Sequence, residues 1–283
     1  MDFSLTDYYD CAQALLKAEG RNNEIFFVYV KGSQNYGLDT TTSDVDVVVV
    51  IFPSIHDIAE NQTALSKTYS MDNPYFSSIK GNEKGLVSFV DVRNYFKGLQ
   101  RHNFSYLEGL FTPYIKVTPY LMKDYQDLKQ LSQPLAKASV RNAIHTLVGA
   151  SQSAYCNIEK KLNNNDIAGA NKKLASFFRF SYMISEYLKQ RKSYYFDYSK
   201  CLYFENVTRR NFLIGLKQEK RTSLYEGFKQ RVERLKERNS KLLTENLETE
   251  EDAQMLAQVI EKMNILLRKS LSLILFFPLC HHN

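Results

Sequence analysis

The chain has 283 residues, 44% of them hydrophobic and 24% charged, so it is long enough for about two globular domains and wholesale disorder is excluded. Its 37 basic against 31 acidic residues give a net charge of +6, which permits an anionic partner without demonstrating one. The four cysteines include no CxxC pair, which argues against metal ribbons and disulfide frameworks. The opening residues lack a signal-peptide pattern, and the longest apolar run, residues 271–280, is too short to span a membrane. We therefore expect a cytoplasmic protein without membrane insertion.

The first part of the chain alternates helix and strand signals. Residues 5–18 carry apolar side chains at helical spacing, whereas residues 24–30 and 45–52 are short apolar runs of strand composition. Residues 86–92 form a third strand candidate, and residues 95–110 return to helical periodicity. This order predicts a small mixed sheet with flanking helices.

Strand signals nearly vanish after Thr118. The aromatic stretch 192–206 is expected to form a short hairpin or a packed loop. Four long amphipathic helices are expected at residues 139–162, 166–190, 223–247 and 249–276.

The change in pattern predicts an α+β protein with two domains. We expect a mixed α/β domain over residues 1–115 and a helical domain over residues 116–283. The C-terminal helices are amphipathic enough to hold a partner protein or a second copy of the chain.

Residues 31–50, KGSQNYGLDTTTSDVDVVVV, carry the strongest chemical signal. Asp44 and Asp46 open a predicted strand two positions apart, so both side chains leave one face about 6.5–7 Å from each other. Carboxylates this close repel one another unless a cation lies between them. Gly32 and Ser33 follow the preceding strand, where glycine lets a phosphate approach the backbone and the serine hydroxyl can hold its oxygens. A dication beside a phosphate cradle is the layout of phosphoryl or nucleotidyl transfer.

A third carboxylate is usually needed to hold a second metal ion and to deprotonate an acceptor. Asp91 lies on the next predicted strand, and we expect an adjacent strand to bring it to the same end of the sheet. Two metals about 3.5–4 Å apart would stabilise the attacking and leaving oxygens of an in-line displacement. The sequence therefore predicts a catalytic two-metal site at Asp44, Asp46 and Asp91.

The string G-S-x-x-Y-G-L-x-T-x-x-S-D-x-D at residues 32–46 resembles the signature of the DNA-polymerase-β-like nucleotidyltransferase superfamily. It is most similar to the branch of predicted nucleotidyltransferases that includes the RNA-ligase-associated proteins of bacteria and phages. Residues 91–111 resemble that branch's D-x-x-x-x-F…N-x-x-x-x-E-x-L-F block, and Lys173 with Arg179 matches its K-x5-R pair. The resemblance covers roughly residues 24–188.

This resemblance implies a polymerase-β-like catalytic domain whose nucleotide cleft is closed by the helical domain. Asp44 and Asp46 would ligate two Mg²⁺ ions, replaceable by Mn²⁺, and Asp91 would ligate the catalytic ion and help to deprotonate the incoming hydroxyl. Gly32 and Ser33 would hold the triphosphate, and Lys173 and Arg179 would neutralise its charge. The implied reaction moves an NMP or dNMP from an NTP or dNTP to a hydroxyl acceptor and releases pyrophosphate. Glu108 is expected to be structural rather than catalytic. The family neighbourhood implies RNA repair or anti-phage defence.

The acceptor is left open by the sequence. Template-independent addition to a nucleic acid 3′ end, or synthesis of a short oligonucleotide, is the leading hypothesis. Nucleotide transfer onto a protein hydroxyl, including self-modification on Tyr, Ser or Thr as in toxin–antitoxin systems, is an alternative, as is synthesis of a signalling nucleotide. A catalytically inactive nucleotide-binding subunit belongs to another class, and the clustered acids argue against it.

Basic residues interleaved with tyrosines follow Arg179. They would bind a single-stranded nucleic acid if the cations meet phosphates and the rings meet bases. The alternative is that the tyrosines pack the helical domain while the basic side chains face water. The basic residues are Lys189, Arg191, Lys192, Lys200, Arg209, Arg210, Lys217, Lys220 and Arg221.

Overall fold

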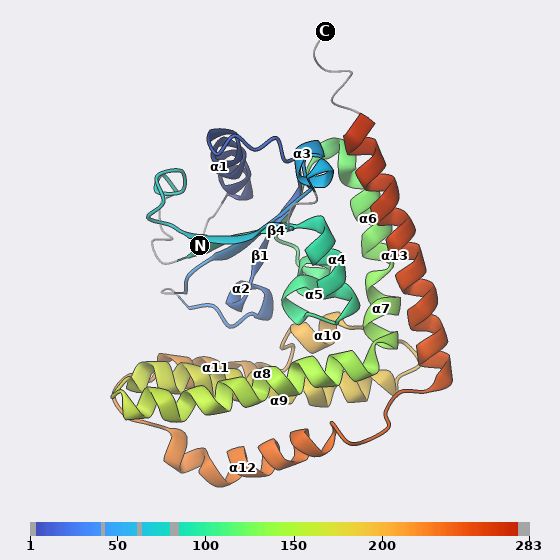
Figure 1. Cartoon of the computed structure of the whole chain (residues 1–283). Coiled ribbons are helices and arrows are strands. Elements are labelled where there is room, and N and C mark those ends of the chain that lie inside the picture. Colours follow the sequence, from blue (N-terminus) through green and yellow to red (C-terminus); the bar gives the residue numbers. More distant parts are fainter. Residues whose placement is uncertain (1–3, 41–42, 61–63, 80–84, 277–283) are drawn as a thin grey trace. The chain divides into compact units, whose positions relative to one another are not determined.

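A computed structural model describes residues 4–40, 43–60, 64–79 and 85–276 of the chain (Figure 1). The N-terminal part contains a five-stranded mixed sheet with helices, and the C-terminal part is largely helical, which confirms the α+β prediction. The strand order is β3-β4-β2-β1-β5. The strands are β1 (Ile25–Lys31), β2 (Asp46–Ile51), β3 (Ser66–Ser70), β4 (Leu86–Asp91) and β5 (Ile115–Val117).

The helices before residue 140 are mostly short, and those after it are mostly long. The first group is α1 (Leu5–Ala18), α2 (Ser33–Tyr36), α3 (Ile55–Ala59), α4 (Val92–Gln100), α5 (Phe104–Phe111), the 3₁₀ turn η1 (Pro119–Leu121), α6 (Met122–Gln130) and α7 (Ser132–Ala138). The second group is α8 (Val140–Asn163), α9 (Ile167–Arg191), α10 (Ser199–Leu202), α11 (Val207–Gln218), α12 (Tyr225–Lys241) and α13 (Glu250–Phe276).

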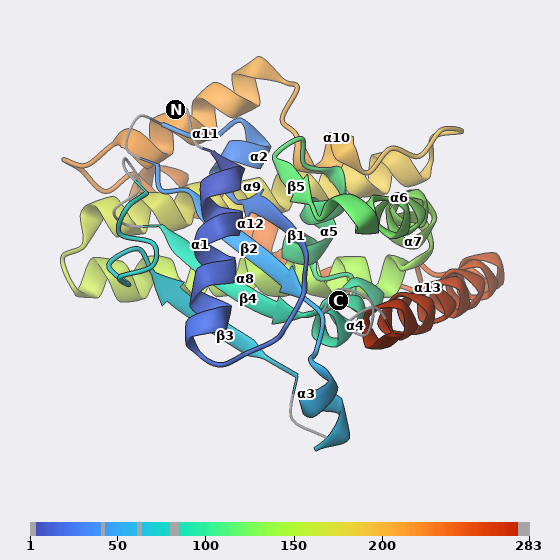
Figure 2. The same cartoon turned by 90° about the horizontal axis from the view of Figure 1, so that it is seen from above.

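Both faces of β1 and β2 are covered, which explains why the sequences of these strands are continuous apolar runs and do not alternate between apolar and polar residues. On one face, α1 lies across the sheet (Figure 2) and packs its buried Tyr8, Ala12 and Leu16 into a cluster with Val28 and Val47. Burial of this apolar surface is the main stabilising contribution on that side.

The opposite face is covered by aromatic side chains from α4 and α6. The ring of Phe27 lies 5.4 Å from that of Tyr95 and 5.3 Å from that of Tyr125, in edge-on geometry. Helix α5 approaches this face closely because Gly109 has no side chain. A Cβ atom there would lie 2.8 Å from the Tyr29 ring. The Tyr29 hydroxyl donates a hydrogen bond to the Ser105 carbonyl at 2.8 Å, which connects β1 to α5.

The direction of the strands decides which residues share an end of the sheet. β1 and β2 are antiparallel, with Lys31 opposite Asp46. β2 and β4 are parallel, with Val47 opposite Val87 and Ile51 opposite Asp91. The end of β1 therefore lies beside the beginnings of β2 and β4.

The sequence analysis predicted β1, β2 and β4 but missed the edge strands β3 and β5. β3, SKTYS, is polar and mostly exposed, and it pairs only with β4 in the described sheet, as suits an edge strand. The single helix expected over residues 95–110 is two helices. The chain breaks at His102, whose φ is +54°, and Asn103 caps the next helix by accepting a hydrogen bond from the Ser105 N–H.

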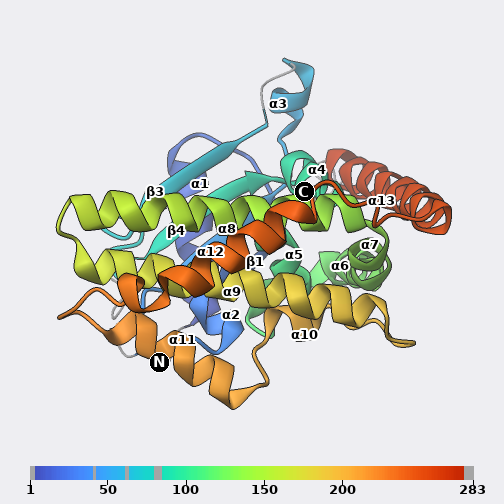
Figure 3. The same ribbon diagram turned by 90° about the horizontal axis from the view of Figure 1, so that it is seen from below.

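The long helices of the C-terminal part confirm the predicted periodicity. α8 and α9 pack along each other, and α12 packs against both (Figure 3). The stretch 192–206 is a packed loop with the short helix α10, and not a hairpin. Its Tyr198 is buried against Tyr187 of α9, with ring centroids 6.2 Å apart.

The chain divides into two compact units, and the division differs from the predicted boundary after residue 115. One unit contains the described residues up to 35, from 43 to 135 and from 255 onward, and the other contains Tyr36–Thr40 and Ala136–Gln254. Helix α6 belongs with the sheet because Tyr125 packs on Phe27. The end of α13 joins this unit, where Lys269 Nζ lies 3.2 Å from Asp124 Oδ1.

Within the described part of the chain, no helix combines the length and apolar character that crossing a membrane requires. Residues 277–280 of the apolar run near the C-terminus lie outside the described residues.

Candidate active site

A tight turn joins β1 to α2 at Gly32. The φ of Gly32 is +97°, a left-handed conformation that residues with a side chain rarely adopt. Ser33 begins α2 directly after it. The Gly32 N–H donates to Oε1 of Glu108 at 3.0 Å, and the Glu108 side chain on α5 is buried. The buried Asn35 donates to the Val30 carbonyl at 2.6 Å. These contacts hold the turn against the end of β1.

The two predicted acids lie at the same end of the sheet as this turn. Asp46 is the first residue of β2, and its Oδ1 accepts a hydrogen bond from the Leu86 N–H at 3.1 Å. Gln34 Nε2 donates to the main-chain carbonyl of Asp44 at 2.9 Å, which ties α2 to the segment before β2. Both aspartates are half-buried. Val47, the next residue of β2, is buried in the cluster beneath α1, so the alternation of the strand directs Asp46 to the opposite face.

Two polar residues that the sequence analysis missed share this face with Asp46. Lys31 is the cross-strand partner of Asp46, and its Nζ lies 3.5 Å from the Ser88 hydroxyl on β4. The signal for Lys31 was available, since it is the charged residue that ends the otherwise apolar sequence of β1. Its ammonium group offsets part of the acidic charge at this end of the sheet.

The expectation that Asp91 reaches the same end of the sheet is wrong. β4 runs parallel to β2, so Asp91 lies opposite Ile51, about 16 Å along the strands from the level of Asp46. Asp91 is buried and caps α4 by accepting from the Arg93 N–H at 2.8 Å. Both of its oxygens bind the Arg93 guanidinium, at 2.9 and 2.7 Å, which raises the pKa of Arg93. Asp91 is a structural ion-pair residue here.

Replacing Asp91 with alanine is expected to lower the free energy of unfolding by about 1–3 kcal/mol, because the helix cap and a charged hydrogen bond are lost. Any catalytic rate, expressed per folded molecule, should stay within about threefold of the wild type. Urea unfolding and a turnover assay at matched folded concentration check both parts. A 100-fold loss of rate in Asp91→Asn, with an unchanged free energy of unfolding, would contradict the structural role and indicate that Asp91 is a metal ligand.

The two carboxylates that remain, those of Asp44 and Asp46, suit a hard cation that takes its other ligands from a substrate and from water. The described residues contain no group of three or more His, Cys, Asp or Glu side chains that could hold a metal ion. Asp44 and Asp46 supply carboxylate oxygens, and Mg²⁺ is commonly held by one or two carboxylates together with substrate phosphates and water. These two residues fit one such ion, and Asp91 adds no ligand to a second.

Lys173 and Arg179 both lie on α9, but about 120° apart around the helix, since they are six positions apart in the sequence. The Arg179 guanidinium lies 4.4 Å from the ring of Tyr36 and 4.4 Å from that of Phe180. Its Nε is buried and has no hydrogen-bond partner among the described residues. Tyr36 is the last residue of α2, so Arg179 packs against the segment that follows the glycine turn.

Further basic side chains of the helical unit contact the same segment. Lys217 Nζ donates to the Leu38 carbonyl at 2.6 Å, and a Cβ atom on Gly37 would lie 3.5 Å from the Arg210 side chain. Residues 36–40 are therefore held by α9 and α11.

The buried carboxylate of Glu108 accepts the hydrogen bond of the Gly32 N–H, so we expect that replacing Glu108 changes the turn. Glu108→Leu leaves the Gly32 N–H without this acceptor and should cost about 1–3 kcal/mol of stability, whereas Glu108→Gln keeps an oxygen there and should cost less. If the turn holds phosphate, KM for the nucleotide should rise more in Glu108→Leu than in Glu108→Gln. Equal KM values in both variants and the wild type would contradict this positioning role.

Comparison of the chain with protein-family models and with curated proteins finds no match.

Proposed function

We propose that this protein is a metal-dependent nucleotidyltransferase of the polymerase-β-like kind. It would transfer an NMP or dNMP from a nucleoside triphosphate to a hydroxyl acceptor and release pyrophosphate. The observation that carries the proposal is the meeting of Asp46 and the Gly32–Ser33 turn at one end of the sheet, with Asp44 two residues away. Acidic side chains beside a glycine turn fit a triphosphate that brings its own cation.

Each residue of the site has a defined task in this proposal. Gly32 would let a phosphate approach the turn, and the Ser33 hydroxyl would hold its oxygens. Asp44 and Asp46 would hold Mg²⁺, with Mn²⁺ as a substitute. Bound magnesium supplies charge neutralisation at the α-phosphate and a lower pKa for an attacking hydroxyl. Lys31 sits opposite Asp46 and adds positive charge where phosphates would lie.

The helical unit would contribute cations to the triphosphate. Arg179 supports this role because its Nε lacks a hydrogen-bond partner among the described residues, while its guanidinium packs on Tyr36. Lys173 is half-buried on another side of α9, and it remains part of the proposal as a second cation.

The preferred acceptor is the 3′ end of a nucleic acid, or a nucleotide in a growing short oligonucleotide, extended without a template. A second candidate is transfer onto the protein itself. Tyr194 and Tyr195 favour testing it, because these tyrosines are 87% and 79% exposed.

The test incubates the purified chain with Mg²⁺ or Mn²⁺ and each of the eight NTPs and dNTPs, without an added acceptor. Denaturing gels detect nucleotide ladders, and intact protein mass detects self-modification. Asp44→Asn/Asp46→Asn is the control. A ladder or a mass shift lost in this control supports the proposal. If no substrate gives a product, single-stranded RNA and DNA are added as acceptors. No product with these acceptors either would contradict the transferase activity and favour a catalytically inactive, nucleotide-binding protein.

A further inference from the structure

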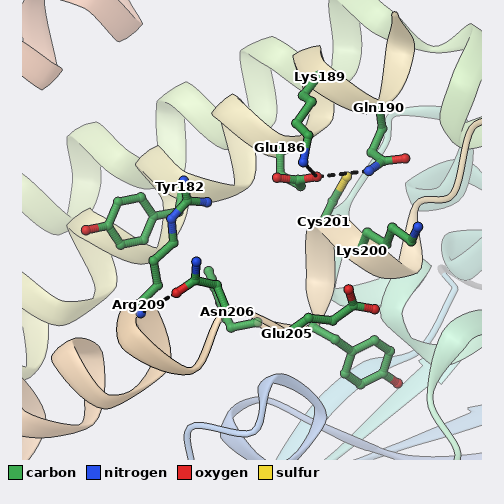
Figure 4. Close-up of a pocket in the computed structure, with 11 residues that line it drawn as sticks. Tyr182, Glu186, Lys189, Gln190, Lys200, Cys201, Glu205, Asn206 and Arg209 are labelled. Carbon is green, nitrogen blue, oxygen red and sulfur yellow. Dashed lines mark hydrogen bonds and ion pairs between the residues drawn. The ribbon is translucent and has the colours of Figure 1, made fainter. Parts of the chain in front are cut away.

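The helical unit contains a cavity of about 490 Å³ that no role has yet been given (Figure 4). Figure 4 shows Tyr182, Glu186 and Lys189 extending from α9, and Lys200 and Arg209 from the segment that forms α10 and the start of α11. All lining residues fall between 182 and 209, so the cavity lies within one unit. Its volume is within the range of about 300–1,000 Å³ that small-ligand sites occupy.

The cavity lining carries three basic and two acidic side chains, which leaves a net charge of +1. Lys189 Nζ lies 3.2 Å from Glu186 Oε1, and Gln190 Nε2 donates to the same oxygen at 2.9 Å. Burial raises the pKa of Glu186, but these hydrogen bonds outweigh it and hold the pKa below its ordinary value, so Glu186 is ionised and compensated. Lys200 and Arg209 are exposed and form no ion pair with the described residues, and Glu205 is the other acid of the lining.

Aromatic rings form the rest of the wall. The Arg209 guanidinium lies 5.1 Å from the ring of Tyr182, and Tyr203 and Phe204 also line the cavity. An aromatic surface beside cations suits a flat base attached to phosphate. Cys201 borders the cavity too, but burial raises the pKa of its thiol, so it does not offer a thiolate for covalent chemistry.

We infer that this cavity binds one nucleotide of a single-stranded nucleic acid, with the base against the aromatic wall on the Tyr203 side and the phosphate on Lys200 and Arg209. An acidic peptide would use the cations but leave the aromatic wall without a partner. The inference builds on the proposed function because such a strand is the acceptor that the reaction would need. The loop between α9 and α10 continues the same chemistry, with Lys192, Tyr194 and Tyr195 exposed.

The experiment measures fluorescence anisotropy of a labelled eight-residue oligoadenylate with the full chain, without nucleoside triphosphate or divalent metal. Lys200→Ala/Arg209→Ala removes the two cavity cations. Lys160→Ala/Lys241→Ala makes the same charge change on exposed lysines of α8 and α12. AMP and inorganic phosphate are added separately as competitors at equal concentration.

We expect the cavity variant to bind at least tenfold more weakly, and the slope of log K against log salt to fall by about 0.7, since the contact with one phosphate is lost. The control variant should bind like the wild type, and AMP should compete better than phosphate. Equal losses in both variants, equal competition by phosphate, or no binding by the wild type would overturn the inference.

The binding result is separable from the proposed function. Asp44→Asn/Asp46→Asn should bind the oligoadenylate like the wild type, because the cavity lies in the helical unit. Normal binding without nucleotide transfer would contradict the reaction and keep the cavity as a site. Nucleotide transfer without oligoadenylate binding would keep the reaction and remove the cavity from it.

Discussion

Replacing Asp46 with asparagine is expected to lower the rate of nucleotide transfer by about 100- to 1,000-fold. Loss of one carboxylate removes several kcal/mol of metal-dependent barrier lowering, and each 1.36 kcal/mol is a tenfold change in rate. Asparagine keeps an oxygen that can accept from the Leu86 N–H, so the start of β2 should stay in place. The free energy of unfolding should therefore change by less than about 0.5 kcal/mol.

Steady-state turnover and urea unfolding of the same preparation test this prediction. Asp10→Asn makes the identical chemical change on the exposed side of α1 and serves as the control. The control should keep wild-type turnover. Near-full turnover in Asp46→Asn would mean that the acids at the start of β2 do not hold the catalytic metal.

Replacing Phe27 with alanine is expected to lower the free energy of unfolding of the sheet unit by about 3–5 kcal/mol. Phe27 is fully buried, and its ring contacts those of Tyr29, Tyr95 and Tyr125 on the same face that carries Asp46. Alanine would leave a cavity that these rings cannot fill. Phe27→Leu keeps most of the volume and should cost less, about 1.5 kcal/mol.

Urea unfolding gives the size of this effect, and amide hydrogen exchange gives its location. Protection should fall in β1 and β2 while α8 and α9, which belong to the other unit, keep theirs. A loss below about 1 kcal/mol for Phe27→Ala would show that the aromatic face is not a packed core.

The parts of the fold that the sequence predicted well are those with a strong local pattern. Residues 47–51 are all valine or isoleucine because β2 is buried on both faces, and a run of this kind predicts a strand without further context. The long helices α8 and α9 show their apolar periodicity over more than five turns. β3 was missed because its five residues are polar, and its strand conformation comes from pairing with β4.

In the candidate site, too, the residues predicted correctly are those whose arrangement follows from the local sequence. Gly32, Ser33, Asp44 and Asp46 are close in the sequence, and the turn between two neighbouring strands brings them to one end of the sheet. Asp91 was misplaced because its position depends on whether β4 runs parallel or antiparallel to β2. No local pattern encodes that choice, and in the parallel arrangement the acid falls at the far end, where it caps α4.

Residues that shape the site without reacting were the hardest to predict. Glu108 and Asn35 are polar residues that become buried only when α5 packs on β1, so their role depends on contacts across 76 positions for Glu108 and 77 for Asn35. The sequence marked Glu108 as structural, and its hydrogen bond to Gly32 gives that role a location beside the glycine turn.

The most direct test of the central claim follows the two ends of the triphosphate separately. The protein is incubated with Mg²⁺, single-stranded RNA and ATP labelled at either the α- or the γ-phosphate. Nucleotidyl transfer predicts that α-label enters the RNA or the protein while γ-label is released as pyrophosphate, and that neither occurs in Asp46→Asn. Transfer of γ-label to an acceptor, or release of γ-label as inorganic phosphate without α-label incorporation, would contradict the assignment.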